Sequence, residues 1–102
     1  MIPSIGRIVE YTLTRQEAES INKRRLDAVN SEVSKTNSGA VVHAGNHVVE
    51  GEKYPLIITR VWGTHEGAAV NGQVLLDGND NLWVTSRVEG VGAGQWHKPT
   101  YI

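Results

Sequence analysis

Short runs in which apolar and polar residues alternate recur along this 102-residue chain and predict β-strands. The first run, IGRIVEYTL, is rich in β-branched and aromatic residues, which are common in strands. Similar runs follow, and Gly, Pro, Asn, Asp or other polar residues separate them. The predicted strands lie at 5–13, 40–45, 56–63, 70–76 and 81–88.

Residues 15–31 show instead the 3.6-residue periodicity of an amphipathic helix. Thr14 and Glu17 stand at its start with the spacing of a capping box, in which each side chain binds a free backbone N–H of the other residue. Arg25 falls in the middle of the apolar arc of this helix. Its guanidinium therefore either reaches the edge of the arc or faces an anion, namely a carboxylate of the protein or a ligand phosphate. The arc itself consists of Ala18, Ile21, Ala28, Val29 and Val33.

One helix followed by short strands at hairpin spacing predicts an α+β protein with a small antiparallel SH3-like barrel or bent sheet. The helix is N-terminal and amphipathic, and it is inserted after the first strand. We expect a single domain over residues 1–102, because the chain has the length of one small domain. It comprises a strand at 5–13, a helix at 15–31 and antiparallel strands within 40–101.

The segment DGNDN at 77–81 fits two interpretations. Asp77 begins an Asp-x-Asn-x-Asn pattern, which has the spacing of the first three ligands of an EF-hand loop. The sixth and twelfth positions, however, are Leu82 and Val88 in place of the required Gly and Glu. Asp, Gly and Asn between two alternating runs are typical of a tight hairpin turn. The sequence therefore predicts a turn that joins two strands.

The predicted hairpin gathers polar and aromatic side chains on one face. Trp83 offers stacking or cation–π contact, and Arg87 offers a fork for phosphate or carboxylate. Carboxamides can read the edge of a base. Arg60 and Trp62 repeat the Arg/Trp pairing on the preceding strand, at alternate positions that are predicted to face the same way. The face is predicted to hold Asn71, Gln73, Leu75, Trp83, Thr85 and Arg87. The predicted ligand-binding residues are Trp83, Thr85 and Arg87, supported by Arg25, Asn71, Gln73 and Tyr11.

Two other roles stay open for these residues. Trp83 also fits as a cap on the core beneath the helix, with Arg87 paired to Glu89 or Asp77 at the surface. Trp and Arg are equally favoured at the centre of subunit interfaces. A ligand site formed between subunits would combine both functions.

Composition narrows the function classes. The net charge of −1 argues against broad electrostatic binding of nucleic acid, so no direct DNA binding is expected. The absence of Cys excludes disulfides, zinc–thiolate sites and cysteine nucleophiles. We expect neither a signal peptide nor a membrane span, since no basic region precedes an apolar run and no segment approaches 18 apolar residues. These features predict a protein of a reducing cytoplasm.

Motifs for catalysis or metal binding are weak. His43 and His47 are four residues apart, but Gly and Asn between them indicate a turn rather than a helix. No Ser or Thr stands in a recognisable nucleophile motif. The segment GVGAG at 90–94 is followed by QWHKP, which does not start a helix, so we expect a flexible crossing segment rather than a phosphate loop. The sequence thus predicts a non-enzymatic protein without a metal or another cofactor.

Three stretches carry a resemblance to known proteins: MIPSIGRIVEYTL at the N-terminus, INKRR in the helix, and VNGQVLLDGNDNLWVTSRVEG with GQW after it. In these stretches the chain resembles a group of small, mostly uncharacterised proteins of tailed bacteriophages and prophages. The resemblance covers nearly the whole chain, least clearly at 32–66. It implies a viral protein that works in the cytoplasm of a host bacterium.

Small phage proteins without enzymatic activity commonly act on host systems, and one apt class is the nucleotide sponge. Such a homo-oligomer sequesters the nucleotide messengers of anti-phage defence (CBASS or Thoeris) and so permits immune evasion. We therefore expect an anti-CBASS-like or anti-Thoeris-like protein that binds a small nucleotide ligand, namely a cyclic nucleotide or a similar molecule. The alternatives are a module that binds a host or virion protein and a DNA-packaging accessory.

Overall fold

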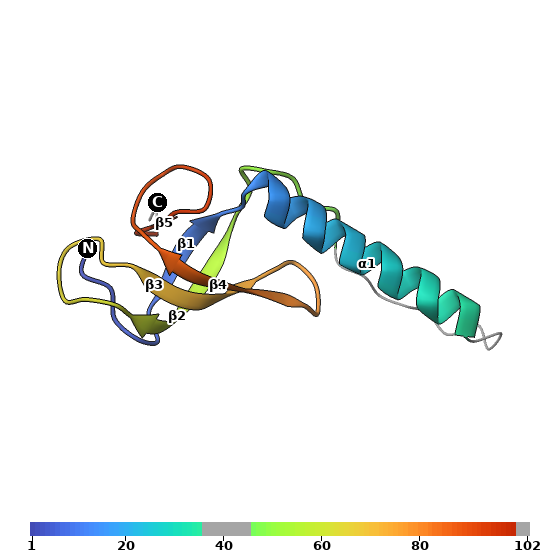
Figure 1. Cartoon of the computed structure of the whole chain (residues 1–102), viewed down its shortest axis with the longest axis horizontal. Coiled ribbons are helices and arrows are strands. Elements are labelled where there is room, and N and C mark those ends of the chain that lie inside the picture. Colours follow the sequence, from blue (N-terminus) through green and yellow to red (C-terminus); the bar gives the residue numbers. More distant parts are fainter. Residues whose placement is uncertain (36–45, 100–102) are drawn as a thin grey trace.

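The computed structural model of the protein describes residues 1–35 and 46–99, apart from the side chains of residues 29–35. This part of the chain folds into a helix and a sheet, so the predicted α+β class is confirmed (Figure 1). The strand predicted at 40–45 lies outside the described residues. The elements are β1 (Ile8–Thr12), α1 (Arg15–Lys35), β2 (Lys53–Val61), β3 (Val70–Leu75), β4 (Asn81–Arg87) and β5 (Trp96–His97).

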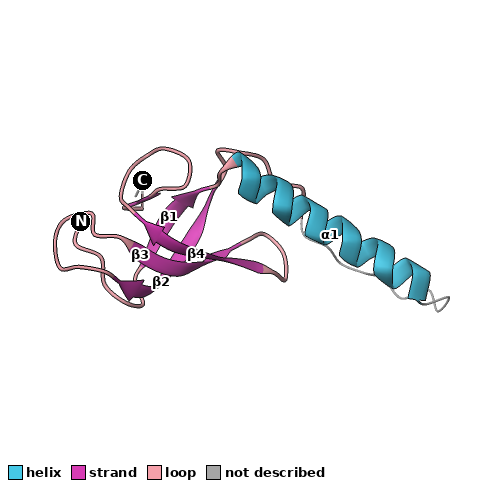
Figure 2. Cartoon of the chain, in the orientation of Figure 1, coloured by secondary structure: helices cyan, strands magenta, loops and turns pink. Residues whose placement is uncertain are grey.

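The strands form one sheet in the order β4-β3-β2-β1-β5, and each neighbouring pair is antiparallel. The predicted hairpin is confirmed, because β3 and β4 are paired from Leu75 opposite Asn81 back toward Val70 opposite Arg87. Residues 76–80 form the turn between them (Figure 2).

The sheet bends back on itself. Glu89, just beyond β4, forms an isolated bridge with Trp96 of β5. The Trp96 amide donates to the Val88 carbonyl at 3.2 Å, and the Gly90 amide donates to the Trp96 carbonyl at 2.8 Å. Since β4 and β5 stand at opposite ends of the strand order, these contacts bring the two edges together. The strongly bent sheet of the prediction is present, and closure as an SH3-like barrel stays a prediction.

The concave side of the bent sheet holds the core. Trp96 is fully buried, and its indole Nε1 donates to the Arg87 carbonyl at 3.0 Å, so the polar atom of this large side chain is satisfied. Every strand contributes apolar side chains to this side. The buried hydrophobic residues of the strands are Val9, Tyr11, Leu56, Ile58, Val70, Val74, Val84 and Trp96.

Helix α1 packs on the sheet only over its first half. The capping box is confirmed, because the Glu17 amide donates to Thr14 Oγ1 at 3.1 Å and the Thr14 amide donates to Glu17 Oε1 at 3.0 Å. Ala18 and Ile21 are buried as predicted, whereas Ala28 is exposed. A 21-residue helix is about 31 Å long, and α1 runs away from the sheet (Figure 1). Of the predicted arc, Ala18 and Ile21 thus pack against the core, and the side chains of Val29 and Val33 lie outside the described part of the structure.

The Gly-rich segment at 90–94 is a folded loop, where a flexible crossing segment was expected. The Gly94 amide donates to the Thr12 carbonyl at 2.8 Å, and the Gly92 amide donates to Gln95 Oε1 at 2.9 Å. The Gln95 side chain lies so close to Gly90 and Gly92 that a Cβ at either position would collide with it. The glycines thus make room for a carboxamide of the protein itself.

Candidate functional site

The convex side of the sheet, called here the outer face, carries an exposed apolar row. Trp83 lies opposite Gln73, Gln73 opposite Ile57, and Ile57 opposite Ile8. Side chains directly opposite each other in antiparallel strands contact one another. Trp83 is 61% exposed and Ile8 is 54% exposed, so the described residues leave the row open to solvent. Trp83 therefore does not cap the core beneath the helix.

A bulge in β2 adds an arginine and a second tryptophan to the outer face. The pairing with β3 shifts by one residue between Ile58 and Arg60, which leaves Thr59 as the extra residue. A bulge reverses the alternation of the residues that follow it. Arg60 and Trp62 are therefore both exposed, while Val61 packs against the core. The prediction that Arg60 and Trp62 face the same way is confirmed, although a regular strand would have turned both inward.

Arg60 and Trp62 form a stacked pair. The guanidinium carbon of Arg60 lies 4.1 Å from the centre of the Trp62 ring, which is close enough for a cation–π interaction. The indole Nε1 of Trp62 donates to Asn71 Oδ1 at 2.9 Å, which fixes the ring. Within the described residues Arg60 has no carboxylate partner, whereas Arg15, Arg24, Arg25 and Arg87 are all ion-paired. The positive charge on the outer face is thus available to a ligand.

A bulge in β4 turns Arg87 away from Trp83. Val84 pairs with Gly72 and Arg87 with Val70, so Thr85 and Ser86 together stand opposite one residue of β3. Ser86 adopts a φ of 54°, which is uncommon for a residue with a side chain. The prediction that Trp83, Thr85 and Arg87 share one face is wrong for Arg87, because the extra residue reverses the alternation.

Arg87 belongs instead to a cluster beneath the start of α1. Its Nη2 donates to Glu17 Oε2 at 3.1 Å, and its guanidinium carbon lies 5.9 Å from the Tyr11 ring. The Tyr11 hydroxyl donates to the same carboxylate at 2.8 Å. Burial, and then the hydrogen bond to Glu17, raise the pKa of Tyr11. Because Tyr11 is fully buried, its predicted role as a support for ligand binding finds no surface here.

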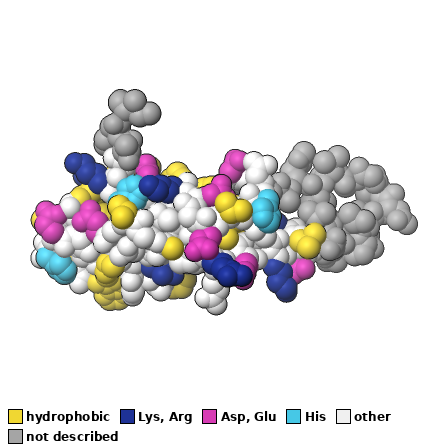
Figure 3. All heavy atoms as spheres, turned by 90° about the horizontal axis from the view of Figure 1, so that it is seen from above, with side chains coloured by type: hydrophobic (Ala, Val, Ile, Leu, Met, Phe, Trp, Pro, Cys, Tyr) yellow, Lys and Arg dark blue, Asp and Glu magenta, His cyan; other side chains and the backbone are white. Residues whose placement is uncertain are grey.

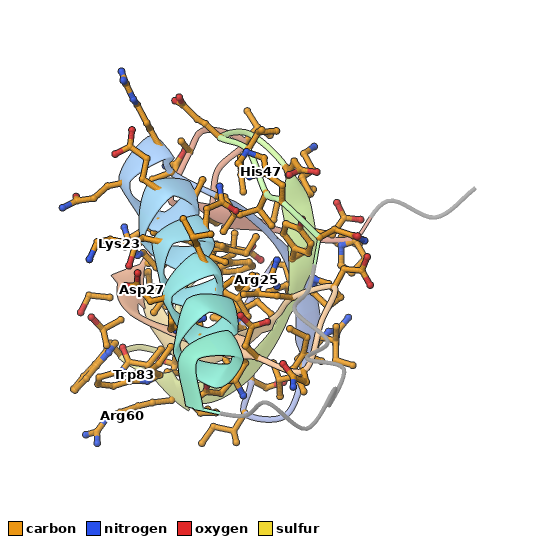
Figure 4. All side chains as sticks on the ribbon, turned by 90° about the vertical axis from the view of Figure 1, so that its right-hand side faces the viewer. Lys23, Arg25, Asp27, His47, Arg60 and Trp83 are labelled. Atoms are coloured by element: carbon orange, nitrogen blue, oxygen red, sulfur yellow. The ribbon has the colours of Figure 1, made fainter. Side chains whose placement is uncertain are left out.

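Arg25 is also occupied within the protein. Its Nε donates to Asp80 Oδ2 at 2.9 Å, its Nη2 donates to Asp80 Oδ1 at 2.7 Å, and its Nη1 donates to the Asn46 carbonyl. Of the two roles foreseen for Arg25, the anionic partner is the one observed, and that partner is a carboxylate. Arg25 is only 7% exposed, so it is a structural residue in this conformation. Figure 4 shows Arg25 between α1 and the sheet, with Arg60 and Trp83 projecting elsewhere on a common side.

Two clefts adjoin these features. One, of about 530 Å³, lies at the start of α1 and includes Arg15, Glu17 and Arg87. The carboxylate of Glu17 lies in this cleft and is already occupied, because it binds Arg87 and caps the helix. The other, of about 340 Å³, continues the outer face from Ile8 toward Lys53, Pro55 and Pro99. The second cleft extends the apolar row.

Charged side chains of both signs are interspersed over the face in Figure 3, so no single-sign patch dominates that view. Among the described side chains, those of residues 1–28 and 46–99, no three of His, Asp or Glu come together in a way that would hold a metal ion. His43 lies outside the described residues. In the part of the chain that the structure covers, no helix combines the length and apolar character needed to cross a bilayer.

The fold and the outer face define a small α+β domain with an exposed aromatic and basic surface on its sheet. No protein-family model matches the chain, and no curated protein or solved structure shows significant similarity to it. The chemistry of the surface therefore carries the functional argument.

The structure brings four of the seven predicted ligand-binding residues to the outer face, namely Asn71, Gln73, Trp83 and the exposed Thr85. It removes Arg87, Arg25 and Tyr11 from that face. Arg60 and Trp62 take their place, and their alternate spacing in the sequence was the signal for them. The two bulges had no comparable signal, because an extra residue in a strand leaves its composition unchanged.

Proposed function

We propose that this protein binds a small nucleotide-type signalling molecule on its outer face and sequesters it without chemical change. The observation that carries the proposal is the Arg60–Trp62 stacked pair, whose charge has no carboxylate partner among the described residues, on the same face as the exposed Trp83. This combination of flat rings and a guanidinium suits a ligand that has both bases and phosphates.

The aromatic part of the surface suits nucleobases. Trp83 offers an exposed indole, and every base has a π-face that stacks on aromatic rings. Asn71 and Gln73 are two residues apart on β3, which places them about 7 Å from each other along the strand. Trp62 is held at Asn71, and Trp83 lies opposite Gln73, so two indoles flank a short polar segment. Such a segment can accept and donate hydrogen bonds at the edge of a stacked base.

The basic part of the surface suits phosphate. A guanidinium binds phosphate oxygens through two parallel N–H donors, and the aromatic ring beneath it restricts its orientation. In the stacked pair, the Trp62 ring covers one face of the Arg60 guanidinium and leaves its N–H edge free for such contacts. The described groups on this face supply stacking, charge and amides, and they include no nucleophile held by a neighbouring base.

The resemblance to phage proteins supplies the biological setting of the proposal. A viral protein in the cytoplasm of an infected or lysogenic bacterium gains from removing a nucleotide messenger of anti-phage defence, and this requires tight binding and no turnover. The proposed protein is thus an anti-CBASS-like or anti-Thoeris-like sponge. A homo-oligomer would add surface to a face that is shallow in a single copy.

The experiment is a thermal-shift screen against mono-, di- and cyclic oligonucleotides and ADP-ribose derivatives. A ligand at 100 times its Kd stabilises by about 2.7 kcal/mol, and each kcal/mol raises the Tm of a domain of this size by roughly 4–8 °C. A hit should lose its shift in Arg60→Ala and Trp83→Ala, while both variants keep the Tm of the free protein. Lys23→Ala is the matched control, since Lys23 is 79% exposed on α1 and its charge is removed far from the outer face.

The same screen separates the outer face from the cleft at the start of α1. Loss of the shift in Arg15→Ala, with Arg60→Ala unaffected, would place the ligand in that cleft and contradict the proposal. No shift from any compound of the panel would refute nucleotide binding at useful affinity.

One observation favours a second function, the binding of a host or virion protein. The row of Ile8, Ile57 and Trp83 presents branched and aromatic side chains across three strands, and Trp is enriched among the residues that dominate binding energy at protein interfaces. This function predicts that nucleotides produce no shift and that Trp83→Ala abolishes association with the partner protein while the Tm stays unchanged.

A further inference from the structure

Asn71 stands at the one point of the sheet where both neighbouring strands are irregular. On one side, Thr59 and Arg60 of β2 share the position opposite Asn71. On the other side, Thr85 and Ser86 of β4 share it. Two bulges thus flank a single residue of the central strand. A bulge leaves one residue outside the ladder, so each needs another partner for its free backbone groups.

The side chain of Asn71 supplies such a partner for the bulge of β4 and also binds Trp62, just beyond β2. Its Oδ1 accepts from the Ser86 amide at 2.9 Å and from Trp62 Nε1 at 2.9 Å. A carbonyl oxygen has two lone pairs, so these two donors use its full capacity. The backbone carbonyl of Asn71 accepts from Thr59 Oγ1 at 3.3 Å, which ties the extra residue of β2 to the same position. One residue therefore holds a donor from each bulged strand.

The bulges decide which side chains reach the outer face. The bulge of β2 turns Arg60 and Trp62 outward, and the bulge of β4 turns Arg87 inward toward Glu17. Without the bulges, regular alternation would turn Arg60 inward and Arg87 toward the outer face. The arrangement of the proposed ligand surface thus depends on both irregularities.

We propose that Asn71 is a positioning residue for the outer face, in which one side-chain oxygen holds the bulge of β4 and fixes the Trp62 ring beneath Arg60. The consequence for ligand binding rests on the proposed function, while the positioning role does not. Sequence reasoning placed Asn71 as a group that reads a base edge. In the structure, Oδ1 of Asn71 accepts from two donors of the protein itself, so only the Nδ2 amide of this side chain is left for a ligand.

The test follows the indole N–H resonances of the protein by NMR. There are three Trp residues, so Trp62, Trp83 and the buried Trp96 give three separate reporters. In Asn71→Leu, which removes the acceptor, the Trp62 indole resonance should shift and its hydrogen exchange should accelerate about tenfold or more. The Trp83 resonance should stay in place, whereas the Trp96 indole, which donates to the Arg87 carbonyl directly after the β4 bulge, is expected to respond together with Trp62. A role limited to overall stability would instead accelerate the exchange of the paired amides of β1 and β2 by the same factor.

Asn71→Asp is the conservative variant, because a carboxylate keeps the acceptor oxygen in the same position. It should keep the slow exchange of the Trp62 indole, although the charge of the new acceptor moves the resonance itself. Gln73→Leu is the matched control, since Gln73 lies on the same strand and the same face, two residues away. It should leave the Trp62 resonance unchanged. An unshifted Trp62 resonance in Asn71→Leu, or fast exchange of the Trp62 indole in Asn71→Asp, overturns the proposal.

Hydrogen exchange on the wild-type protein keeps the test decisive if Asn71→Leu does not fold. The Ser86 amide and the Trp62 indole N–H should then exchange at least about ten times more slowly than the exposed indole of Trp83. Equal rates for the two indoles overturn the proposal.

Nucleotide titrations form the second arm of the test. If a nucleotide binds the wild type, Asn71→Leu should weaken it about tenfold or more. Equal binding by both proteins overturns the link between Asn71 and the ligand surface. If the NMR result is as expected and no nucleotide binds the wild type, the positioning role stands and the proposed function fails.

Discussion

Replacing Asp80 by Asn is expected to destabilise the protein by about 3 kcal/mol. The substitution keeps the shape of the side chain and removes its charge, so the guanidinium of Arg25 loses its counter-ion. The Arg25 side chain is 8% exposed and that of Asp80 is 20% exposed. Breaking a buried pair by removing one partner costs about 3–5 kcal/mol, and the partial exposure of Asp80 places the effect at the lower end.

The two single substitutions should differ. Asp80 has a second cationic neighbour, because Arg24 Nη2 lies 3.2 Å from Asp80 Oδ2. Arg25→Met therefore leaves a carboxylate that still has a partner, whereas Asp80→Asn leaves a buried cation whose remaining acceptors, the Asn46 carbonyl and the new amide oxygen, are both uncharged. We expect Arg25→Met to cost less than Asp80→Asn. The double variant with Leu at position 80 should recover much of the loss, since apolar replacement of a buried pair is often neutral.

The assay is urea and thermal unfolding followed by circular dichroism. A loss of 3 kcal/mol corresponds to a fall in Tm of about 12 °C or more. The pKa of Asp80 is lowered in the folded protein, chiefly by the hydrogen bonds from Arg25. Its contribution is therefore present above the pKa of an unfolded Asp, about 3.9, and is lost as the pH falls through the folded value.

The difference in stability between wild type and Asp80→Asn should thus shrink as the solution is acidified through the lowered pKa of Asp80 in the folded protein. A loss of less than about 1 kcal/mol at neutral pH would show that the pair behaves as an exposed one. A difference in stability that persists unchanged in acid would show that the charge of Asp80 is not its source. Either result would refute the reasoning.

Two further substitutions test the elements that hold the outer face. Thr14→Ala removes the cap of α1 and should cost about 1 kcal/mol, while Thr14→Ser should keep most of the stability, as measured by urea unfolding; equal losses in both would contradict the capping role. Gly72→Ala would place a Cβ 2.5 Å from the Ile57 carbonyl oxygen and 2.6 Å from Leu56 Cδ1, so thermal unfolding should show a loss of about 1–3 kcal/mol. A Tm equal to that of the wild type would mean that β2 and β3 separate without strain.

The sequence was most informative where local chemistry decides the structure. The capping box at Thr14 and the hairpin turn at 77–81 depend on neighbouring residues alone, and both are present in the structure. The acidic residues of the turn have a further role that short-range patterns do not reveal. Asp80 binds Arg25 of α1, and Asp77 Oδ2 accepts from Asn46 Nδ2 at 2.6 Å.

The alternation rule failed where the strands are irregular. Arg87 was predicted on the same face as Trp83, and this holds only if every residue between them stays in the ladder. The extra residue at Thr85 and Ser86 breaks that condition. A bulge is stabilised by contacts from a neighbouring strand, here from Asn71, so it depends on residues distant in sequence.

The composition of the site was predicted better than its geometry. The sequence indicated an indole, a guanidinium and carboxamides on one face, and the structure has such a face. The guanidinium, however, is that of Arg60. Which arginine is available depends on which ones find carboxylates, and Arg25 and Arg87 find Asp80 and Glu17 only through the tertiary fold.

The measurement that tests the central claim most directly is the recovery of a bound ligand. The purified protein is mixed with the nucleotide that gives the largest thermal shift, separated from free ligand by gel filtration, denatured, and the released compound is identified by mass spectrometry. We predict that the wild type retains the nucleotide and releases it unmodified, and that Arg60→Ala retains none. Release of an altered nucleotide, or retention of none by the wild type, would contradict sequestration on the outer face.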